Sequence, residues 1–141
     1  MTQFSTTITI NASQEAVWKI LSDVARWQEW TPTVSNVEVL DEPGLNLGNR
    51  YKVHQPKLQP AVWNVTVLTP PSNFTWESKS LGMHMLAEHI VTPKSTDRSE
   101  LTLTFTFGGW LGELIGRMYG KTAESYIQTE AQSLKKRVEK P

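Results

Sequence analysis

The spacing of apolar residues constrains the fold of this chain more than any other feature. Through most of the chain apolar and polar residues alternate, as in β-strands, and near the C-terminus the apolar residues repeat at the spacing of a helix. In residues 100–107 (ELTLTFTF) apolar side chains alternate with threonine, which is typical of a strand with one apolar and one wet face. Weaker alternation recurs at residues 37–39, 50–54, 61–68, 74–77 and 83–91. From Trp110 to about Val138 the apolar residues repeat instead at the spacing of one long amphipathic helix.

The chain ahead of this region predicts one strand and two short helices. Residues 4–10 alternate, and Ser13 is a suitable N-cap for a helix that carries Glu15 in its first turn, where the helix dipole favours a carboxylate. Asp23 is expected to cap a second short helix that runs to about Trp27.

This order of elements predicts an α+β fold in a single domain, residues 1–141. Each strand has one apolar face, so a sheet of six or seven antiparallel strands must bury that face against another element. The last helix is the only element long enough to cover it. Such a sheet curls strongly, and one helix roughly 10 Å wide does not fill its trough. We therefore expect a cavity between the concave face and the C-terminal helix.

Composition excludes several classes of function. The chain has no cysteine, so it has no disulfide framework and no thiolate metal site. Fourteen basic residues balance fourteen acidic ones, which gives no electrostatic footprint for nucleic acid. Neither a signal peptide nor a membrane-spanning apolar run is recognisable, so we expect a soluble, cytoplasmic protein. The sequence leaves the oligomeric state open, a homodimer included.

The histidines do not predict a metal site. His84 and His89 are five residues apart and point to opposite faces of a regular strand, while His54 lies on the wet face of another. No spaced ligand motif is present, and we expect neither a metal nor another cofactor. His89 falls on the apolar face with Met83 and Met85, although the opposite set of this strand also contains apolar residues, so its inward face stays open.

Bulky side chains on the inward faces are the candidates for the cavity wall. Six of the thirteen aromatic residues are tryptophan, and large rings either fill a core or line a ligand site. Two of them, Trp27 and Trp30, belong to the short helical segment that would close one end of the cavity; the alternative is that they only pack there. The candidate ligand-binding residues are Trp27, Trp30, Tyr51, Trp63, Trp76, Met85, His89, Phe105, Met118 and Tyr119.

Three stretches carry a resemblance to a known family. Residues 4–32 (FSTTITINASQEAVWKILSDVARWQEWTP) resemble the opening of START-like proteins, the SRPBCC or Bet v 1-like helix-grip superfamily, and especially its bacterial polyketide cyclase/dehydrase branch. Residues 65–78 (VTVLTPPSNFTWES) and the closing helical segment are similar to later parts of that family. The matched opening positions are Ala12, Ser13, Glu15, Val17, Trp18, Leu21, Asp23, Trp27, Trp30 and Pro32.

The resemblance implies a helix-grip fold with a hydrophobic cavity. It does not imply one reaction, because the family includes lipid and sterol carriers, aromatic cyclases, quinone-binding proteins and co-chaperones. We expect the chain to bind, for carriage or sensing, a small hydrophobic molecule such as a lipid, a quinone or an aromatic polyketide.

Two other function classes remain as alternatives. A cyclase or dehydratase would use His89 or Tyr51 as an acid–base group. The chain has no catalytic motif, however, and none of its arginines is expected to face inward and stabilise an enolate. The third class is a protein-interaction module, which we rank last because the outward faces are polar.

Glycines recur every four residues into the last helix, at positions 108, 112, 116 and 120. Interior glycines soften a helix, so one interpretation is a gate over the cavity mouth formed by Gly112, Gly116 and Gly120. The other is a closely packed face against the edge of the sheet, or simply a frayed first turn of the helix.

Overall fold

The computed structural model describes residues 2–140. It contains seven strands, two α-helices and one short 3-10 helix within that range. In chain order they are β1 (Thr2–Ile10), α1 (Gln14–Leu21), η1 (Val24–Glu29), β2 (Asn36–Val39), β3 (Arg50–His54), β4 (Ala61–Thr69), β5 (Asn73–Ser80), β6 (Met83–Ser95), β7 (Arg98–Gly108) and α2 (Trp110–Glu139).

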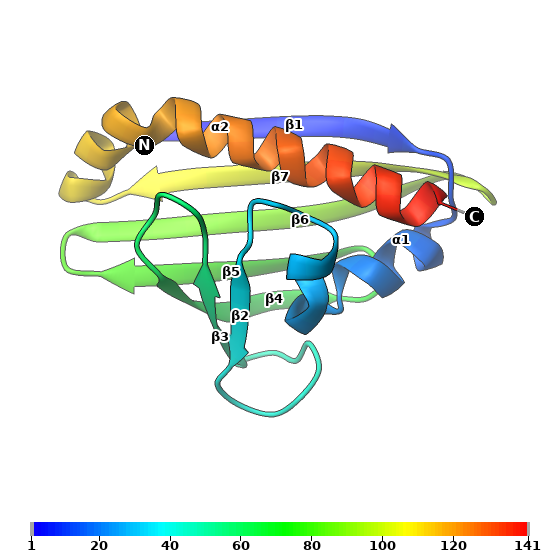
Figure 1. Ribbon diagram of the computed structural model, residues 1–141, viewed down its shortest axis with the longest axis horizontal. Coiled ribbons are helices and arrows are strands. Elements are labelled where there is room, and N and C mark those ends of the chain that lie inside the picture. Colours follow the sequence, from blue (N-terminus) through cyan, green and yellow to red (C-terminus); the bar gives the residue numbers. More distant parts are fainter. Residues whose placement is uncertain (1, 141) are drawn as a thin grey trace.

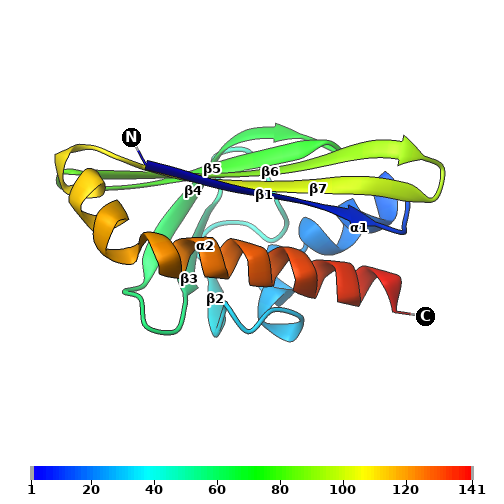
Figure 2. The same ribbon diagram turned by 90° about the horizontal axis from the view of Figure 1, so that it is seen from above.

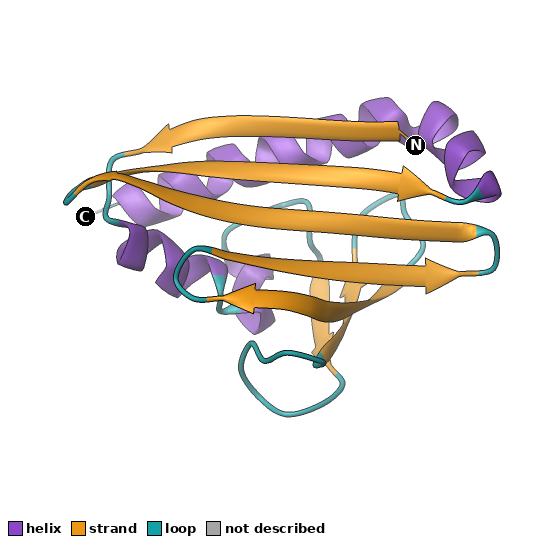
Figure 3. Ribbon diagram, turned by 180° about the vertical axis from the view of Figure 1, so that it is seen from behind, coloured by secondary structure: helices purple, strands orange, loops and turns teal. Residues whose placement is uncertain are grey.

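The strands form one antiparallel sheet in the order β1-β7-β6-β5-β4-β3-β2. Strands β2 to β7 follow one another as a meander, and β1 pairs with β7, which places Phe4 opposite Phe105. Figure 3 shows that the sheet presents one open face, with all helices behind it. The α+β helix-grip prediction, with two short helices after the first strand, is confirmed.

The start of α1 matches the prediction from the sequence, whereas the second short helix differs from it at both ends. The Ser13 side chain accepts a hydrogen bond from the backbone N–H of Ala16 at 3.1 Å, so Ser13 is the N-cap of α1 as predicted. The second helix is a 3-10 helix that continues two residues beyond Trp27, and the Asp23 side chain makes no capping hydrogen bond. Backbone hydrogen bonds alone therefore start this helix.

The long helix α2 crosses the concave face of the sheet and lies mainly along β1 and β7 (Figures 1 and 2). Gly112, Gly116 and Gly120 are buried in this contact. A Cβ at Gly120 would come within 2.7 Å of the Phe4 ring, and one at Gly116 within 3.0 Å of Thr2. Gly116 and Gly120 therefore let α2 approach the edge of the sheet more closely than residues with a side chain would allow.

The core lies between the concave face, α1, η1 and the second half of α2. On β6, Ala87, His89 and Val91 are buried on the inner side, which settles the face that the sequence left open. The outer face of β1 and β7 carries hydroxyl pairs, such as Thr7 with Thr102 at 3.0 Å. No helix within residues 2–140 combines the length and apolar character that a bilayer crossing requires.

Candidate functional site

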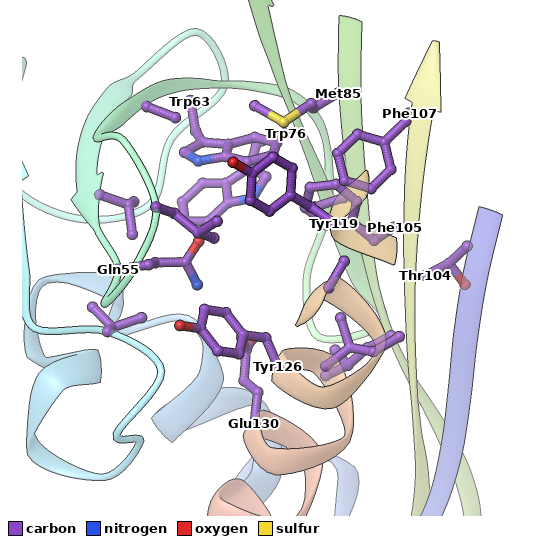
Figure 4. Close-up of a pocket in the computed structure, with 18 of the residues that line it drawn as sticks. Gln55, Trp63, Trp76, Met85, Thr104, Phe105, Phe107, Tyr119, Tyr126 and Glu130 are labelled. Atoms are coloured by element: carbon purple, nitrogen blue, oxygen red, sulfur yellow. The ribbon is translucent and has the colours of Figure 1, made fainter. Parts of the chain in front are cut away.

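A cavity of about 350 Å³ lies between the inner sheet face and α2. Its remaining walls come from η1 and from the β3–β4 loop, residues 55–60. Figure 4 shows aromatic rings from the strands and from α2 converging on it. Seven of the ten candidate ligand-binding residues line it, namely Trp27, Trp63, Trp76, Met85, His89, Phe105 and Tyr119.

The other three candidates lie outside the lining. Tyr51 is buried, but its hydroxyl donates a hydrogen bond to the backbone carbonyl of Gly44 at 2.6 Å, in the β2–β3 loop. Trp30 packs edge-on against Trp27, with the ring centroids 5.8 Å apart. Met118 is 64% exposed, because it falls off the inward stripe of α2. Tyr51 and Trp30 therefore pack behind residues that line the cavity, and Met118 faces away from it.

Tryptophan rings build the deep wall of the cavity. The Trp76 ring stacks on that of Trp63 at 5.6 Å and lies 5.3 Å from that of Trp27. Trp27 is fixed in turn, because its indole N–H donates to the carbonyl of Leu21 at 2.9 Å. The wall is therefore rigid and largely apolar, and it offers aromatic faces to whatever occupies the cavity.

His89 lies in this wall as a neutral imidazole. Burial lowers its pKa from the ordinary value near 6.5 to about 4, and its side chain is only 4% exposed. The ring stacks on Phe74 at 4.1 Å, and Nδ1–H donates to the Phe74 carbonyl at 3.2 Å. Since the ring is neutral, Nε2 carries no proton and is left as a hydrogen-bond acceptor.

Glu130 is a lining residue that the sequence reasoning missed. It lies on α2 one turn beyond Tyr126, and Figure 4 shows the two side chains next to each other at the cavity. The residue is 9% exposed, and burial raises the pKa of its carboxyl group to about 7. The available signal was a carboxylate on the inward stripe, at helical spacing from Tyr126, Ile127 and Leu134.

The β3–β4 loop is the second part that sequence reasoning missed. Gln55, Lys57, Leu58 and Gln59 from this loop line the cavity. The Tyr126 hydroxyl donates a hydrogen bond to the carbonyl of Pro56, which ties the loop to α2. The apolar and polar residues of this loop do not alternate, so its sequence does not indicate on which side of the sheet the loop lies.

The remaining histidines lie away from the cavity. His54 pairs with Glu38, and His84 pairs with Glu77, in each case across neighbouring strands. Within residues 2–140 no group of three or more histidine, aspartate or glutamate side chains is arranged to hold a metal ion.

The chain matches the model of the family described as polyketide cyclase / dehydrase and lipid transport over residues 1–139. No protein among those with curated functions matches it.

Solved structures share the fold of this chain. It is similar to a START superfamily protein from Mycobacterium smegmatis, with a TM-score of 0.76 and 18% identity over 99% of this chain and 98% of that one. It is also similar to the Zhui aromatase/cyclase from Streptomyces sp. R1128, with a TM-score of 0.71 and 18% identity over 96% and 94% of the two chains. Truncated norcoclaurine synthase from Thalictrum flavum gives a TM-score of 0.78 and 11% identity over 99% and 94%.

Proposed function

Since the chain belongs to the polyketide cyclase / dehydrase and lipid transport family, we propose that it binds a small hydrophobic molecule in the cavity between the sheet and α2. The observation that carries this proposal is the cavity itself. Its volume of about 350 Å³ lies within the range of small-molecule sites, and most of its lining is apolar or aromatic.

Burial of apolar surface supplies the affinity in this proposal. Each Å² of ligand surface removed from water contributes roughly 25 cal/mol before the costs of association and ordering. Polar groups at the cavity, such as His89 Nε2 and the Tyr119 hydroxyl, then set the orientation of the ligand.

Binding ranks above the cyclase or dehydratase alternative because of the two residues proposed as acid–base groups. A pKa of about 4 makes His89 a weak base at neutral pH. The Tyr51 hydroxyl is engaged by the Gly44 carbonyl, away from the cavity lining. His89 therefore lies at the cavity but is too weakly basic to act as a general base, and Tyr51 lies outside the cavity lining.

The first experiment is native mass spectrometry of the freshly purified protein, with solvent extraction of whatever it carries. A discrete additional mass that denaturation releases supports binding and identifies the class of ligand. Protein that purifies empty is then screened by thermal shift against fatty acids, quinones and aromatic polyketides.

A pair of tryptophan substitutions places the binding in the cavity. Ala123 lines the cavity, so Ala123→Trp should fill it and abolish binding. Ser125, on the exposed side of the same helix, serves as the matched control, and Ser125→Trp should bind normally. Equal binding by both variants would contradict the proposed function.

A further inference from the structure

We propose that the ligand carries a basic nitrogen, and that the Glu130 carboxylate in the cavity is the group that receives it. This inference rests on the proposed function and specifies the polar chemistry of the same site. In this proposal, Glu130 binds the ammonium group of a ligand whose remaining part is aromatic or otherwise apolar.

The first support is that Glu130 is buried without a partner. Within residues 2–140 its carboxyl group takes part in no hydrogen bond or ion pair, although it is more than nine-tenths buried. By contrast, Glu139 on the same helix pairs with Lys135, and Glu29 on η1 receives Arg137 from it. A buried carboxyl group without a partner is costly, so one that faces a cavity calls for a partner from the ligand.

The second support is the protonation state that this burial sets. With its pKa raised to about 7, the empty site holds Glu130 near its midpoint at neutral pH. A bound ammonium group would stabilise the ionised form and lower that pKa again, so the protein would lose little in ionising Glu130 on binding.

The third support is the aromatic wall of the cavity that Glu130 also lines. Trp27, Trp63 and Trp76 line the same cavity, and a cation over the face of such rings is attracted by their quadrupoles. Among the described residues that line the cavity there is no arginine, and the one lysine, Lys57, is an exposed residue of the β3–β4 loop. The buried part of the cavity is therefore suited to a cation and unsuited to a carboxylate such as a fatty-acid head group.

A neutral ligand is the competing chemistry. A protonated Glu130 would donate a hydrogen bond to a ligand carbonyl or hydroxyl group. The two cases differ in the charge of the preferred ligand and in the direction of the pH dependence, so one set of probes separates them.

The experiment compares three probes that share an apolar body and differ in the polar head: naphthylmethylamine, naphthylmethanol and naphthoic acid. Their affinities are measured by quenching of tryptophan fluorescence and by calorimetry. The protein is used as wild type, as Glu130→Gln and as Glu124→Gln, a matched control on the exposed side of α2. Far-UV circular dichroism confirms that each variant is folded.

We expect the wild type to bind the amine more tightly than the alcohol, and the acid most weakly. Glu130→Gln should weaken the amine by at least about tenfold, since a charged pair is lost, and leave the alcohol nearly unchanged. Glu124→Gln should match the wild type with all three probes.

A second measurement tests the proposal without a substitution. Lowering the pH from about 8 to about 6 should protonate Glu130 and weaken the amine, while the alcohol keeps its affinity. The other titratable lining residues are Lys57, Glu88, His89, Tyr119 and Tyr126. The same titration in Glu130→Gln separates their contributions from that of Glu130, and this variant should show no such loss.

Two results would overturn the inference, and they are distinguishable. If the alcohol binds as tightly as the amine, and Glu130→Gln leaves the amine unaffected, the amine assignment fails and the proposed function stands. If none of the three probes binds to the wild type at any pH, the cavity is not a site for such molecules and both proposals fail.

Discussion

The Tyr126 hydroxyl donates a hydrogen bond to the Pro56 carbonyl, and so this side chain joins α2 to the β3–β4 loop at the cavity. Both partners belong to segments that line the cavity. Within the loop, the backbone N–H of Leu58 donates a hydrogen bond to the carbonyl of Gln55 at 3.2 Å. We expect the opening of this loop, and with it the entry of a ligand, to depend on how often this contact breaks.

Tyr126→Phe should open the β3–β4 loop more often. Loss of one hydrogen bond costs about 1 kcal/mol, which corresponds to a roughly fivefold rise in the open population. Hydrogen exchange at residues 55–60 and the rate of probe association should both increase. Tyr119→Phe is the control, because it removes a hydroxyl from the same cavity without touching Pro56. Unchanged exchange in Tyr126→Phe would show that this contact does not hold the loop.

Substitutions of two glycines in α2 should have opposite effects on stability. Gly120→Ala places a methyl group against the Phe4 ring, and we expect a loss of about 1–2 kcal/mol after the gain in helix propensity. At Gly112 the nearest atom would be 3.5 Å away, an ordinary contact, so Gly112→Ala should be neutral or stabilise by up to about 1 kcal/mol. Urea unfolding of both variants measures the difference, and an equal loss in both would contradict the packing argument.

Hydrogen exchange also tests the gate proposed for Gly112, Gly116 and Gly120. Their close packing on β1 and β7 favours a helix that stays closed, so we expect slow exchange from residue 112 to residue 120 in the empty protein. Fast exchange confined to this stretch would instead support the gate and place ligand entry at the start of α2.

Glu130→Gln should stabilise the protein at high pH. The pKa of Glu130 is raised in the folded state, so its contribution to stability is fully present below the ordinary value near 4.5 and is lost as pH rises through about 7. Relative to the wild type, the variant should therefore gain stability between about pH 5 and pH 8, by on the order of 3 kcal/mol. Urea unfolding at a series of pH values measures this gain, and parallel curves would contradict the raised pKa.

His89 should act in the opposite direction. Its folded-state pKa of about 4 lies below the ordinary 6.5, so the neutral ring is favoured in the fold. That contribution is present above about pH 6.5 and is lost as pH falls toward about 4. The pH dependence that Glu130 contributes has the opposite sign, so the test is made in the Glu130→Gln variant. In that variant, a further His89→Gln substitution should abolish much of the loss of stability at acidic pH. Identical acid unfolding with and without His89 would contradict this.

The sequence was a good guide to the fold because strands and helices differ in period. Alternation at residues 100–107 predicted β7 and its inner face, with Leu101 and Leu103 buried and Phe105 at the cavity. Ser13 marked the start of α1 for a local reason, since a serine side chain caps the helix that follows it.

The site was predictable mainly where the period of a strand or a helix fixed the direction of a side chain. Trp63, Trp76 and His89 line the cavity because alternation turns them inward. Tyr51 is also turned inward, but the β2–β3 loop takes up its hydroxyl, and alternation says nothing about where a loop folds. Glu130 was missed because inward-facing residues are recognised in a sequence by their apolar character, and a buried glutamate lacks it.

The close approach of α2 to β1 has a consequence for how proteins of this shape diversify. The close contact of α2 with the sheet lies at one edge, where Gly116 and Gly120 meet Thr2 and Phe4, whereas the β3–β4 loop forms part of the cavity boundary on the other side. Insertions or substitutions in that loop can change the size of the chamber without disturbing the helix–sheet contact. The loop that bounds the cavity and the close helix–sheet contact can therefore change independently of each other.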